Sequence, residues 1–328
     1  MIPKNRLIYS SWFKTFATEN PIEICDVGAR EELFKPFDSL PNSIIRVHGF
    51  EPDSEEAERL QKRYEANQRT YYPYGLWSES TLVDLSLAEL AGNSSIHPPN
   101  IEHLSKVFPP LHWTNRRPIK TLSLPVKSLD DVISEHKFGC DLLKIDTQGS
   151  EFEILIGAER ALKEAISFVL LETWTMEVHK GQALSGKIME WMHSKGFALI
   201  RTHNGADWHR KEVDQLNRVG LRTLVGLDLL FVRVDFKFTD NEFAYKKIVK
   251  SAALAELYGF PDLALQIIDQ NKGNLQEFSA ELNSVKSLIV KNWSKSHEAM
   301  TFRAVRKFFS LLGYSLEKHH SDPYAPLH

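Results

Sequence analysis

One short stretch, residues 22–30 (IEICDVGAR), places the strongest constraint on how this chain can fold. Its apolar residues are β-branched, and it runs through Asp26 into Gly28 and Ala29, after which a helical pattern begins. A buried strand followed by a tight turn and a helix is typical of an α/β sheet. Ligands of such sheets bind at the carboxyl ends of the strands, where a glycine lets the backbone approach closely.

The next predicted strand, residues 44–50, strengthens this interpretation because it ends in Glu51-Pro52-Asp53. Glu51 follows Asp26 by 25 residues. An acidic residue about 20 positions on, at the end of the next strand, is well placed to accept hydrogen bonds from a ribose. The two strands therefore predict a nucleoside-binding crevice. An ordinary strand, turn and helix without a ligand is the alternative that the first motif alone leaves open.

Strand and helix patterns alternate along the following 200 residues. Further strands are predicted at residues 70–76, 81–87, 119–126, 141–146, 168–172, 197–202 and 227–234. Helices are predicted at residues 7–18, 31–40, 54–67, 129–136 and 184–195, with another beginning at Glu151 after a cap at Ser150. This alternation predicts a mostly parallel, doubly wound sheet.

Residues 92–118 interrupt the alternation. The segment is rich in Pro, Ser and Asn and contains His97, His103 and His112. A long loop without secondary structure is usually functional or mobile, so a substrate lid and a mobile surface loop both remain open. The three histidines lack the spacing of metal ligands.

Strand signals end near residue 239, and helices are predicted at residues 243–257, 261–270, 275–293 and 298–312. We therefore predict three parts: an N-terminal helix (residues 1–20), an α/β domain (residues 21–235) and an all-helical extension (residues 240–328). The last helix carries apolar and basic residues, a pattern that suits either packing against its neighbours or peripheral contact with a membrane.

The composition narrows the class of protein. A net charge of −3 argues against a nucleic-acid partner. Only Cys25 and Cys140 are present, and neither belongs to a metal-binding motif. Two thiols without an export signal favour the cytoplasm. The chain contains no apolar run of about 20 residues, so no transmembrane segment is predicted.

Several motifs, in a fixed order, resemble the FkbM-type methyltransferases, which depend on S-adenosylmethionine. They are DVGA (26–29), FEPD (50–53), SSIHPPN (94–100), VKSLDDV (126–132), LLKIDTQGSEFEILIGA (142–158) and LDLLFVR (227–233). The resemblance implies an α/β fold with a doubly wound, mostly parallel, seven-stranded Rossmann-like methyltransferase sheet and, here, an added C-terminal helical domain. It also implies O-methylation of sugars or other hydroxylated acceptors in glycan or secondary-metabolite biosynthesis.

Carried over by position, the resemblance implies a set of cofactor contacts. Asp26, Gly28 and Ala29 of DVGA would contact the methionine end of the cofactor. Glu51 and Pro52, at the second strand end, would lie at the ribose. Gly75 and Leu76, at the third, would border the adenine, and Asp146, at the fourth, would lie beside the methyl group. Arg30 stands where the family usually has Asn, and Glu32 where it has Gly. The planar guanidinium of Arg30 is suited to pair with the methionine carboxylate.

Methyl transfer to a hydroxyl benefits from a general base, and two carboxylates at predicted strand ends are the candidates. Asp146 is the first and Glu172 the second; helix capping, cofactor positioning or a salt bridge are their non-catalytic alternatives. Candidate acceptor-binding residues are Ser94, Ser95, Asn100, Glu177 and His179, the last two alternatively lying in a solvated loop. Asp146 and Glu172 could supply two oxygen ligands to a divalent ion, but the chain lacks a clustered acidic pair at the expected place, so no metal site is predicted.

The function expected is therefore an S-adenosylmethionine-dependent O-methyltransferase that acts on a small-molecule or glycan acceptor. Arg30 and Glu32 keep open a catalytically weak or inactive homologue that serves as a binding module. A nicotinamide-dependent oxidoreductase would require GxGxxG after the first strand, where this chain has one glycine. Homo-oligomer formation is left open.

Overall fold

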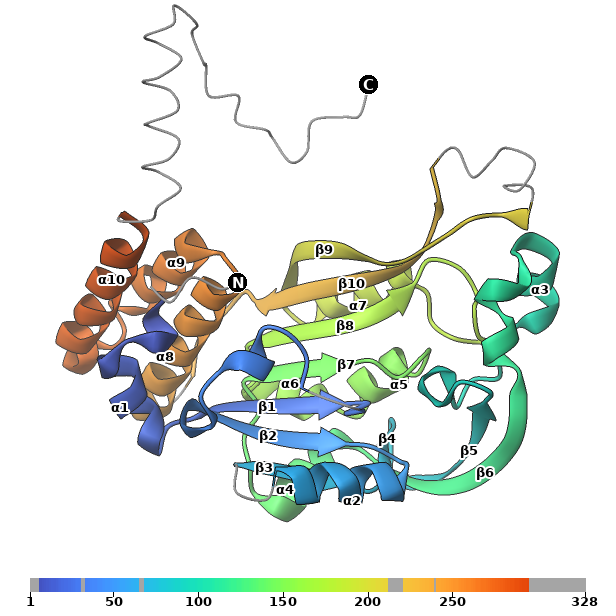
Figure 1. Ribbon diagram of the computed structural model, residues 1–328. Coiled ribbons are helices and arrows are strands. Elements are labelled where there is room, and N and C mark those ends of the chain that lie inside the picture. The colour runs from blue at the N-terminus through green and yellow to red at the C-terminus, as the bar shows by residue number, and fades with distance from the viewer. Residues whose placement is uncertain (1–5, 31–32, 65–67, 212–220, 239, 295–328) are drawn as a thin grey trace, which may run out of the picture.

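The computed structural model describes residues 6–30, 33–64, 68–211, 221–238 and 240–294. Its centre is a seven-stranded sheet with the order β3-β2-β1-β7-β8-β10-β9 (Figure 1). The strands are β1 (Ile22–Val27), β2 (Ile45–Phe50), β3 (Arg69–Tyr72), β7 (Leu142–Ile145), β8 (Phe168–Trp174), β9 (Phe197–Trp208) and β10 (Thr223–Arg233). Neighbouring strands are parallel except that β10 is antiparallel to both β8 and β9. The predicted mostly parallel, seven-stranded α/β sheet is confirmed.

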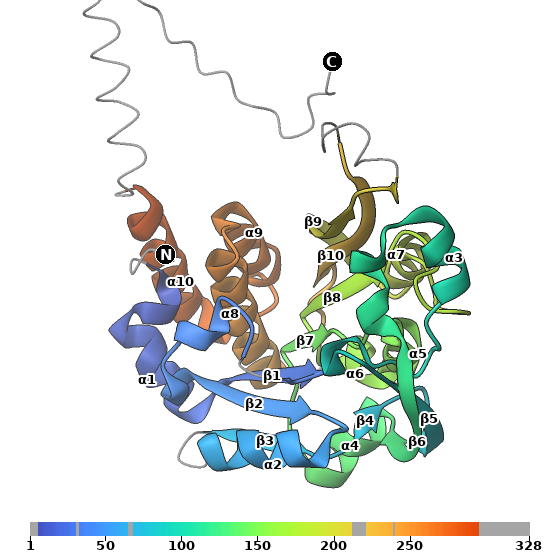
Figure 2. The ribbon, with the colours of Figure 1, turned by 45° about the vertical axis from the view of Figure 1, so that its right-hand side comes forward.

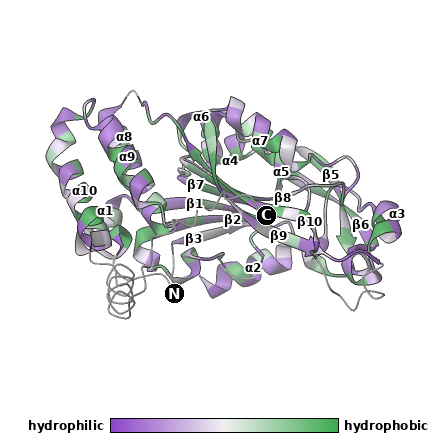
Figure 3. Cartoon of the chain, turned by 90° about the horizontal axis from the view of Figure 1, so that it is seen from above, coloured by the Kyte–Doolittle hydropathy of each residue, from purple (hydrophilic) through white to green (hydrophobic). Residues whose placement is uncertain are grey.

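Helices cover both faces of this sheet, as Figure 3 shows from above. One face packs against α4 (Leu129–His136), α5 (Glu151–Ile156), α6 (Glu159–Glu164) and α7 (Ser185–Ser194), and α2 (Ser54–Arg63) lies on the other. Asp53 caps α2 by accepting from the amides of Glu55 and Glu56, and Ser128 caps α4 by accepting from the amide of Asp131.

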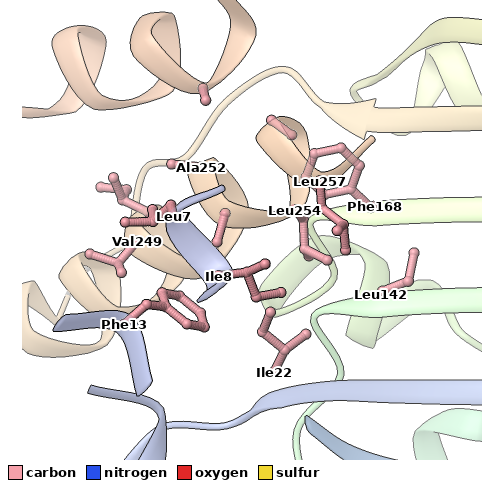
Figure 4. Close-up of a cluster of buried hydrophobic side chains, with 14 of the residues drawn as sticks. Leu7, Ile8, Phe13, Ile22, Leu142, Phe168, Val249, Ala252, Leu254 and Leu257 are labelled. Carbon is pink, nitrogen blue, oxygen red and sulfur yellow. The ribbon is translucent and has the colours of Figure 1, made fainter. Parts of the chain in front are cut away.

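The face that bears α2 is also covered, at the amino ends of the strands, by α1 (Ser11–Glu19), α8 (Asn241–Leu257), α9 (Pro261–Asn271) and α10 (Ser279–Ser294). Figure 4 shows Ile22, Leu142 and Phe168 from three strands beside Leu254 and Leu257 of α8. Burial of this apolar surface holds the helices on the sheet. The predicted helix at residues 298–312 lies outside the described residues.

A buried ion cluster joins α8 to the start of β7. Lys247 Nζ lies 2.5 Å from Asp141 Oδ1, and Lys250 Nζ lies 3.0 Å from Asp141 Oδ2. Asp141 Oδ2 also accepts a hydrogen bond from the amide of Glu23 in β1. One carboxylate therefore connects α8 to two central strands.

A second, three-stranded sheet contains β4 (Gly75–Leu76), β5 (Thr81–Ala88) and β6 (Pro118–Lys127) in the order β4-β6-β5 (Figure 2). The strands predicted at residues 81–87 and 119–126 are confirmed. The single strand predicted at residues 70–76 is wrong, because β3 ends at Tyr72 and the last two residues pair with β6 instead.

Residues 92–118 are ordered into short helices, which corrects the prediction of a loop without secondary structure. They form α3 (Ile101–Val107) and the 3-10 turns η4 (Ala91–Asn93), η5 (Pro110–His112) and η6 (Thr114–Arg116). Asn100 caps α3 by accepting from the amide of His103. Leu104 and Phe108 are buried against Trp174 and Trp208, a distant contact that the local pattern does not contain.

Three further expectations need correction. Residues 33–40 contain only the 3-10 turn η2 (Phe37–Ser39) instead of a helix, and Pro36 lacks the amide that a helix would use there. The predicted N-terminal helix is divided into η1 (Leu7–Tyr9) and α1, which Ser10 caps. Glu172 lies within β8, which continues to Trp174, and does not end it. No helix among the described residues is both long and apolar enough to cross a membrane.

Candidate functional site

The strand residues that face α8 change from apolar to charged along each strand. Alternate residues of a strand share a face, so Ile24 is followed on that face by Asp26, Leu142 by Lys144, and Leu170 by Glu172. The apolar residues are covered by the C-terminal helices, and the charged ones lie beyond them at the carboxyl ends of the strands. This edge is where a parallel sheet binds ligands.

Lys144 stands at the centre of this edge. Its Nζ lies 3.1 Å from Asp26 Oδ1 and 3.7 Å from Asp146 Oδ2, and it donates to the carbonyl oxygen of Gly28 at 3.4 Å. Burial disfavours the ammonium, but the two carboxylates outweigh it and raise the pKa of Lys144. Sequence reasoning missed this residue, although a lysine in the apolar run LLKI was a usable signal.

Asp146, Glu172 and Asp228 form a carboxyl cluster beside Lys144. Asp228 lies directly opposite Glu172 across the β8–β10 pair, and His203 lies opposite Asp228 on β9. Burial, followed by the nearby Asp146, Glu151 and Asp228, raises the pKa of Glu172 to about 9. Glu172 is therefore protonated near neutral pH, while the side chain of Asp146 is 46% exposed and accessible from solvent. Asp228 was not predicted; it interrupts the apolar strand LDLLFVR.

The turn after β7 is held by a glutamate and not by the predicted serine cap. Glu151 Oε1 accepts hydrogen bonds from the amides of Thr147 and Gly149, at 3.1 and 3.0 Å. Ser150 makes no side-chain cap contact with α5. Burial raises the pKa of Glu151 to about 7. Glu151 thus fixes the backbone that follows Asp146.

Gly28 brings the ends of β1, β2 and β7 together. It adopts φ +76°, and its amide and that of Ala29 donate to the carbonyl oxygen of Phe50. A Cβ at this position would lie 2.0 Å from the carbonyl oxygen of Asp146. Only glycine fits both the conformation and the space.

Gly28→Ala is therefore expected to lower the free energy of unfolding by more than about 1 kcal/mol, because the new methyl group must push β1 away from the turn at Asp146. Urea denaturation measures the change. Gly186→Ala is the control, since no atom lies within 4 Å of a Cβ built there, and it should be neutral or stabilising. Equal stability of the two variants would contradict the close approach seen at Gly28.

Glu51 and Arg30 lie together at the end of β2. Glu51 is buried, and its Oε1 accepts from the amide of Asp53 at 2.9 Å. Arg30 lies 3.8 Å from Glu51 Oε1 and 3.5 Å from Asp53 Oδ2. Burial raises the pKa of Glu51. Arg30 thus pairs with the carboxylates of the chain itself; Glu32 lies outside the described residues.

The other predicted cofactor contacts lie around this end of β2. Ala29 is buried against Leu60 and Tyr71. A Cβ built on Gly75 would lie 3.9 Å from Pro52 Cβ, so β4, with Gly75 and Leu76, borders the turn after Glu51. The structure therefore brings the predicted residues at the ends of β1 and β2 and those of β4 to one side of the sheet edge.

The predicted acceptor-binding residues mainly hold two loops together. Ser94 Oγ accepts from the amide of Ala88, and the buried Ser95 donates to the carbonyl oxygen of Gln148. Asn100 Nδ2 donates to Glu177 Oε2 at 2.6 Å.

His179 is fully buried and contacts Gln182. Burial lowers its pKa to about 3, so its ring is neutral. Contact of these residues with an acceptor stays a prediction.

A cavity of about 680 Å³ lies between β10, α5, α7 and the segment that precedes α7. Its lining includes Glu153, Thr175, Gln182, Met189 and Leu227. None of the predicted site residues lines this cavity.

Comparison with known proteins identifies the family. The model of the methyltransferase FkbM domain matches residues 26–199, more than half of the 328 residues. No curated protein matches the chain.

Among solved structures, the methyltransferase FkbM from Methylobacillus flagellatus KT is 16% identical with a TM-score of 0.36, and the match covers 64% of this chain and 44% of that one. The chain thus spans less than half of that protein. Magnesium protoporphyrin IX methyltransferase from Synechocystis PCC 6803, with bound SAM, is 13% identical with a TM-score of 0.33, covering 68% and 75%. Sp1610 of Streptococcus pneumoniae, a putative tRNA (m1A22) methyltransferase, is 10% identical with a TM-score of 0.32, covering 86% and 96%.

These structural similarities are too low to support an argument about the site, and the assignment depends on the family model. That model covers the predicted strand ends at Asp26, Glu51 and Asp146 and the strand that bears Glu172. The chain belongs to the FkbM methyltransferase family.

Proposed function

We propose that this methyltransferase transfers a methyl group to a hydroxyl of a sugar or a similar polar acceptor, in glycan or secondary-metabolite biosynthesis. The observation that carries the proposal is the pairing of an exposed Asp146 with a largely buried Glu172, whose pKa burial raises, at the carboxyl edge of the sheet. A carboxylate next to a neutral carboxyl group is suited to bind and deprotonate a hydroxyl group.

The residues at this edge fit S-adenosylmethionine, which supplies, when bound, a methyl group on a positively charged sulfur. Besides the protonated Glu172, three carboxyl groups lie around the ammonium group of Lys144, so the edge favours a cation; they are those of Asp26, Asp146 and Asp228. Glu51 offers a carboxylate for ribose hydroxyls, and the adenine would be bordered by Gly75 and Leu76.

The acceptor side of the proposal depends on proton transfer. An alcohol is a weak nucleophile until its proton begins to leave, so Asp146 would accept that proton as the oxygen attacks. Glu172, protonated, would donate a hydrogen bond to Asp146 and keep the two carboxyl groups from repelling each other. If Glu172 lost its proton, like charges would separate the pair.

The cytoplasm remains the proposed compartment. Cys25 and Cys140 are both free and buried, which suits a reducing environment. We also propose the division into an N-terminal helix (residues 1–20), a methyltransferase domain (residues 21–235) and a helical extension (residues 240–328). The shared apolar cluster of α1 with α8–α10 supports a role for both terminal parts in covering one face of the sheet.

Glu51→Ala tests the cofactor side. Titration calorimetry of the native protein with S-adenosylmethionine and with S-adenosylhomocysteine is expected to show saturable binding. The affinity should fall about 10- to 100-fold in the variant, because the hydrogen bonds between the Glu51 carboxylate and the ribose hydroxyls are lost. Glu55→Ala is the matched control, because Glu55 is exposed on the first turn of α2. Unchanged affinity in Glu51→Ala would place the ribose elsewhere.

Arg30 favours one alternative function. Its guanidinium pairs with Glu51 and Asp53, so it competes with a ribose for Glu51. A catalytically weak or inactive homologue that uses the fold as a binding module would then show no binding of either cofactor form at millimolar concentration. Recovery of binding in Arg30→Asn would assign that failure to Arg30.

A further inference from the structure

Gln148 has a conformation that needs support from outside its own turn. It is a non-glycine residue at φ +58°, between Asp146 and the helix α5. Residues other than glycine rarely adopt positive φ, and those that do are held by their surroundings, often at functional sites. Ser95 Oγ donates to its carbonyl oxygen at 2.7 Å, and Arg116 Nη1 donates to its Oε1 at 2.8 Å. Both contacts come from the segment between β5 and β6.

The orientation of the Gln148 amide follows from the chemistry of its neighbours. A guanidinium group can only donate hydrogen bonds, so Gln148 must present its oxygen to Arg116. The amide nitrogen then faces the opposite way, where Nε2 donates to Glu172 Oε2 at 2.8 Å. Arg116 therefore dictates which end of the amide meets Glu172.

Arg116 itself is firmly placed. Its side chain is buried, and its guanidinium carbon lies 5.1 Å from the ring centre of Trp174 and 5.6 Å from that of Trp208. Both rings attract a cation. Burial lowers the pKa of Arg116 to about 10, which leaves it charged at neutral pH. Its position relative to β8 and β9 is thus fixed on two sides.

We propose that Arg116 is a positioning residue for methyl transfer, which acts through Gln148 to hold the Glu172 carboxyl group beside Asp146. The inference rests on the proposed function, because it assigns work to the same carboxyl pair. It also explains why the segment at residues 92–118 is ordered against the sheet edge: docking of Arg116 and Ser95 completes the geometry of the turn after β7. Figures 1 and 2 show α3 of this segment at the far end of β8, away from the C-terminal helices.

The pH dependence of Glu172 reports on this contact. The groups that face Glu172 are the carboxyl groups of Asp146, Glu151 and Asp228, the ammonium group of Lys144, the guanidinium group of Arg116 and the amide of Gln148. A hydrogen bond donated to a carboxylate favours its charged form. Losing the Gln148 donor, or the arginine that orients it, therefore raises the pKa of Glu172 beyond its present value.

Two variants, Arg116→Met and Gln148→Met, remove the two donors with little change in side-chain length. The titration of Glu172 is followed by ¹³C NMR of protein labelled at the glutamate carboxyl carbons, with Glu172→Gln used to assign the resonance. In both variants the Glu172 transition should move to higher pH. Arg117→Met is the matched control, since Arg117 is exposed, stacks on Trp113 and takes no part in the contact; it should leave the transition unchanged.

Methyl transfer from radiolabelled S-adenosylmethionine to a panel of hexoses and nucleotide-linked hexoses gives the second readout. For whichever sugar the native enzyme methylates, Arg116→Met and Gln148→Met should each lower kcat about 10- to 100-fold, with the alkaline limit of the pH profile moved upward. The affinity of each variant for S-adenosylmethionine should stay within about twofold of the native value. The kcat of the double variant should be no lower than that of the less active single variant, because both substitutions remove the same contact. Arg116→Lys should retain more activity than Arg116→Met.

The outcomes separate this inference from the proposed function. If Glu172 titrates at its native pH in folded Arg116→Met or Gln148→Met, the positioning role is wrong. It is also wrong if Arg117→Met shifts the titration of Glu172 by as much as these variants do. If the native enzyme methylates no sugar, the proposed acceptor class is wrong, while the NMR titration still decides the role of Arg116. Should Arg116→Met fail to fold, Gln148→Met and Arg116→Lys carry the same test.

Discussion

Asp146→Asn is expected to lower kcat for methyl transfer by about 10²- to 10⁴-fold, the usual contribution of a general base. Asparagine has the same shape as aspartate but cannot take up the acceptor proton. The exposure of Asp146 and its position beside Lys144 and Glu172 make it the carboxylate most accessible to an acceptor. Single-turnover transfer from radiolabelled S-adenosylmethionine measures the effect without interference from product release.

The same substitution should leave cofactor affinity within a few fold, since the loss concerns the acceptor oxygen. Asp84→Asn is the matched control: Asp84 is exposed on β5, in the second sheet, and its variant should keep native kcat. Glu172→Gln should cost less than Asp146→Asn, because a neutral amide replaces a carboxyl group that is already neutral. A kcat for Asp146→Asn within threefold of native, or a larger loss in Glu172→Gln, would contradict the assignment.

Asp141→Asn is expected to lower the free energy of unfolding by about 3–5 kcal/mol, the cost of removing one partner from a buried ion cluster. Lys247 and Lys250 would keep their charges inside the protein without a counter-ion. Asparagine preserves an acceptor for the amide of Glu23, so the measured loss reports mainly on charge. Urea denaturation at neutral pH gives the value.

The sign of the pH dependence follows from the pKa of Asp141. Burial opposes its charge, but Lys247 and Lys250 outweigh burial and lower the pKa to about 2. A carboxyl group with a depressed pKa stabilises the fold above its unfolded pKa of about 3.9, and that contribution is lost as the pH falls toward 2. The difference in stability between native protein and Asp141→Asn should therefore shrink across this window.

Two comparisons make the stability test specific. Asp269→Asn removes an exposed ion pair with Lys286, between α9 and α10, and should cost no more than about 1 kcal/mol. Replacing Asp141, Lys247 and Lys250 together by apolar residues of similar volume should recover much of the loss, because no buried charge then remains. A loss in Asp141→Asn no larger than in Asp269→Asn would show that the cluster contributes little.

The cluster also bears on activity. Asp141 immediately precedes β7, the strand that carries Lys144 and leads to Asp146. The contact of α8 with Asp141 thus anchors the amino end of the strand whose carboxyl end holds the proposed base. This gives the C-terminal helices a physical connection to the site, although they lie at the opposite end of the sheet (Figure 1).

Local patterns in the sequence were sufficient for most of the sheet. β1 and β7 are short apolar runs that end at turn residues, and such runs form buried strands wherever they pair. The turn at Gly28 and the caps at Asp53 and Ser128 depend on residues within a few positions, so they too were predictable. The strand ends identified Asp146 directly.

Tertiary structure decided what lies beside those strand ends. Lys144 was a single cation in an apolar run, and only the pairing of β1 with β7 places its ammonium group on Asp26. Asp228 joins the cluster because β10 enters the sheet antiparallel to β8. Arg116 reaches Gln148 across 32 residues because Trp174 and Trp208, from two distant strands, enclose it. A local pattern specifies which residues form a strand and which side faces inward, but contacts between distant strands depend on packing of the whole chain, so only the folded structure reveals them.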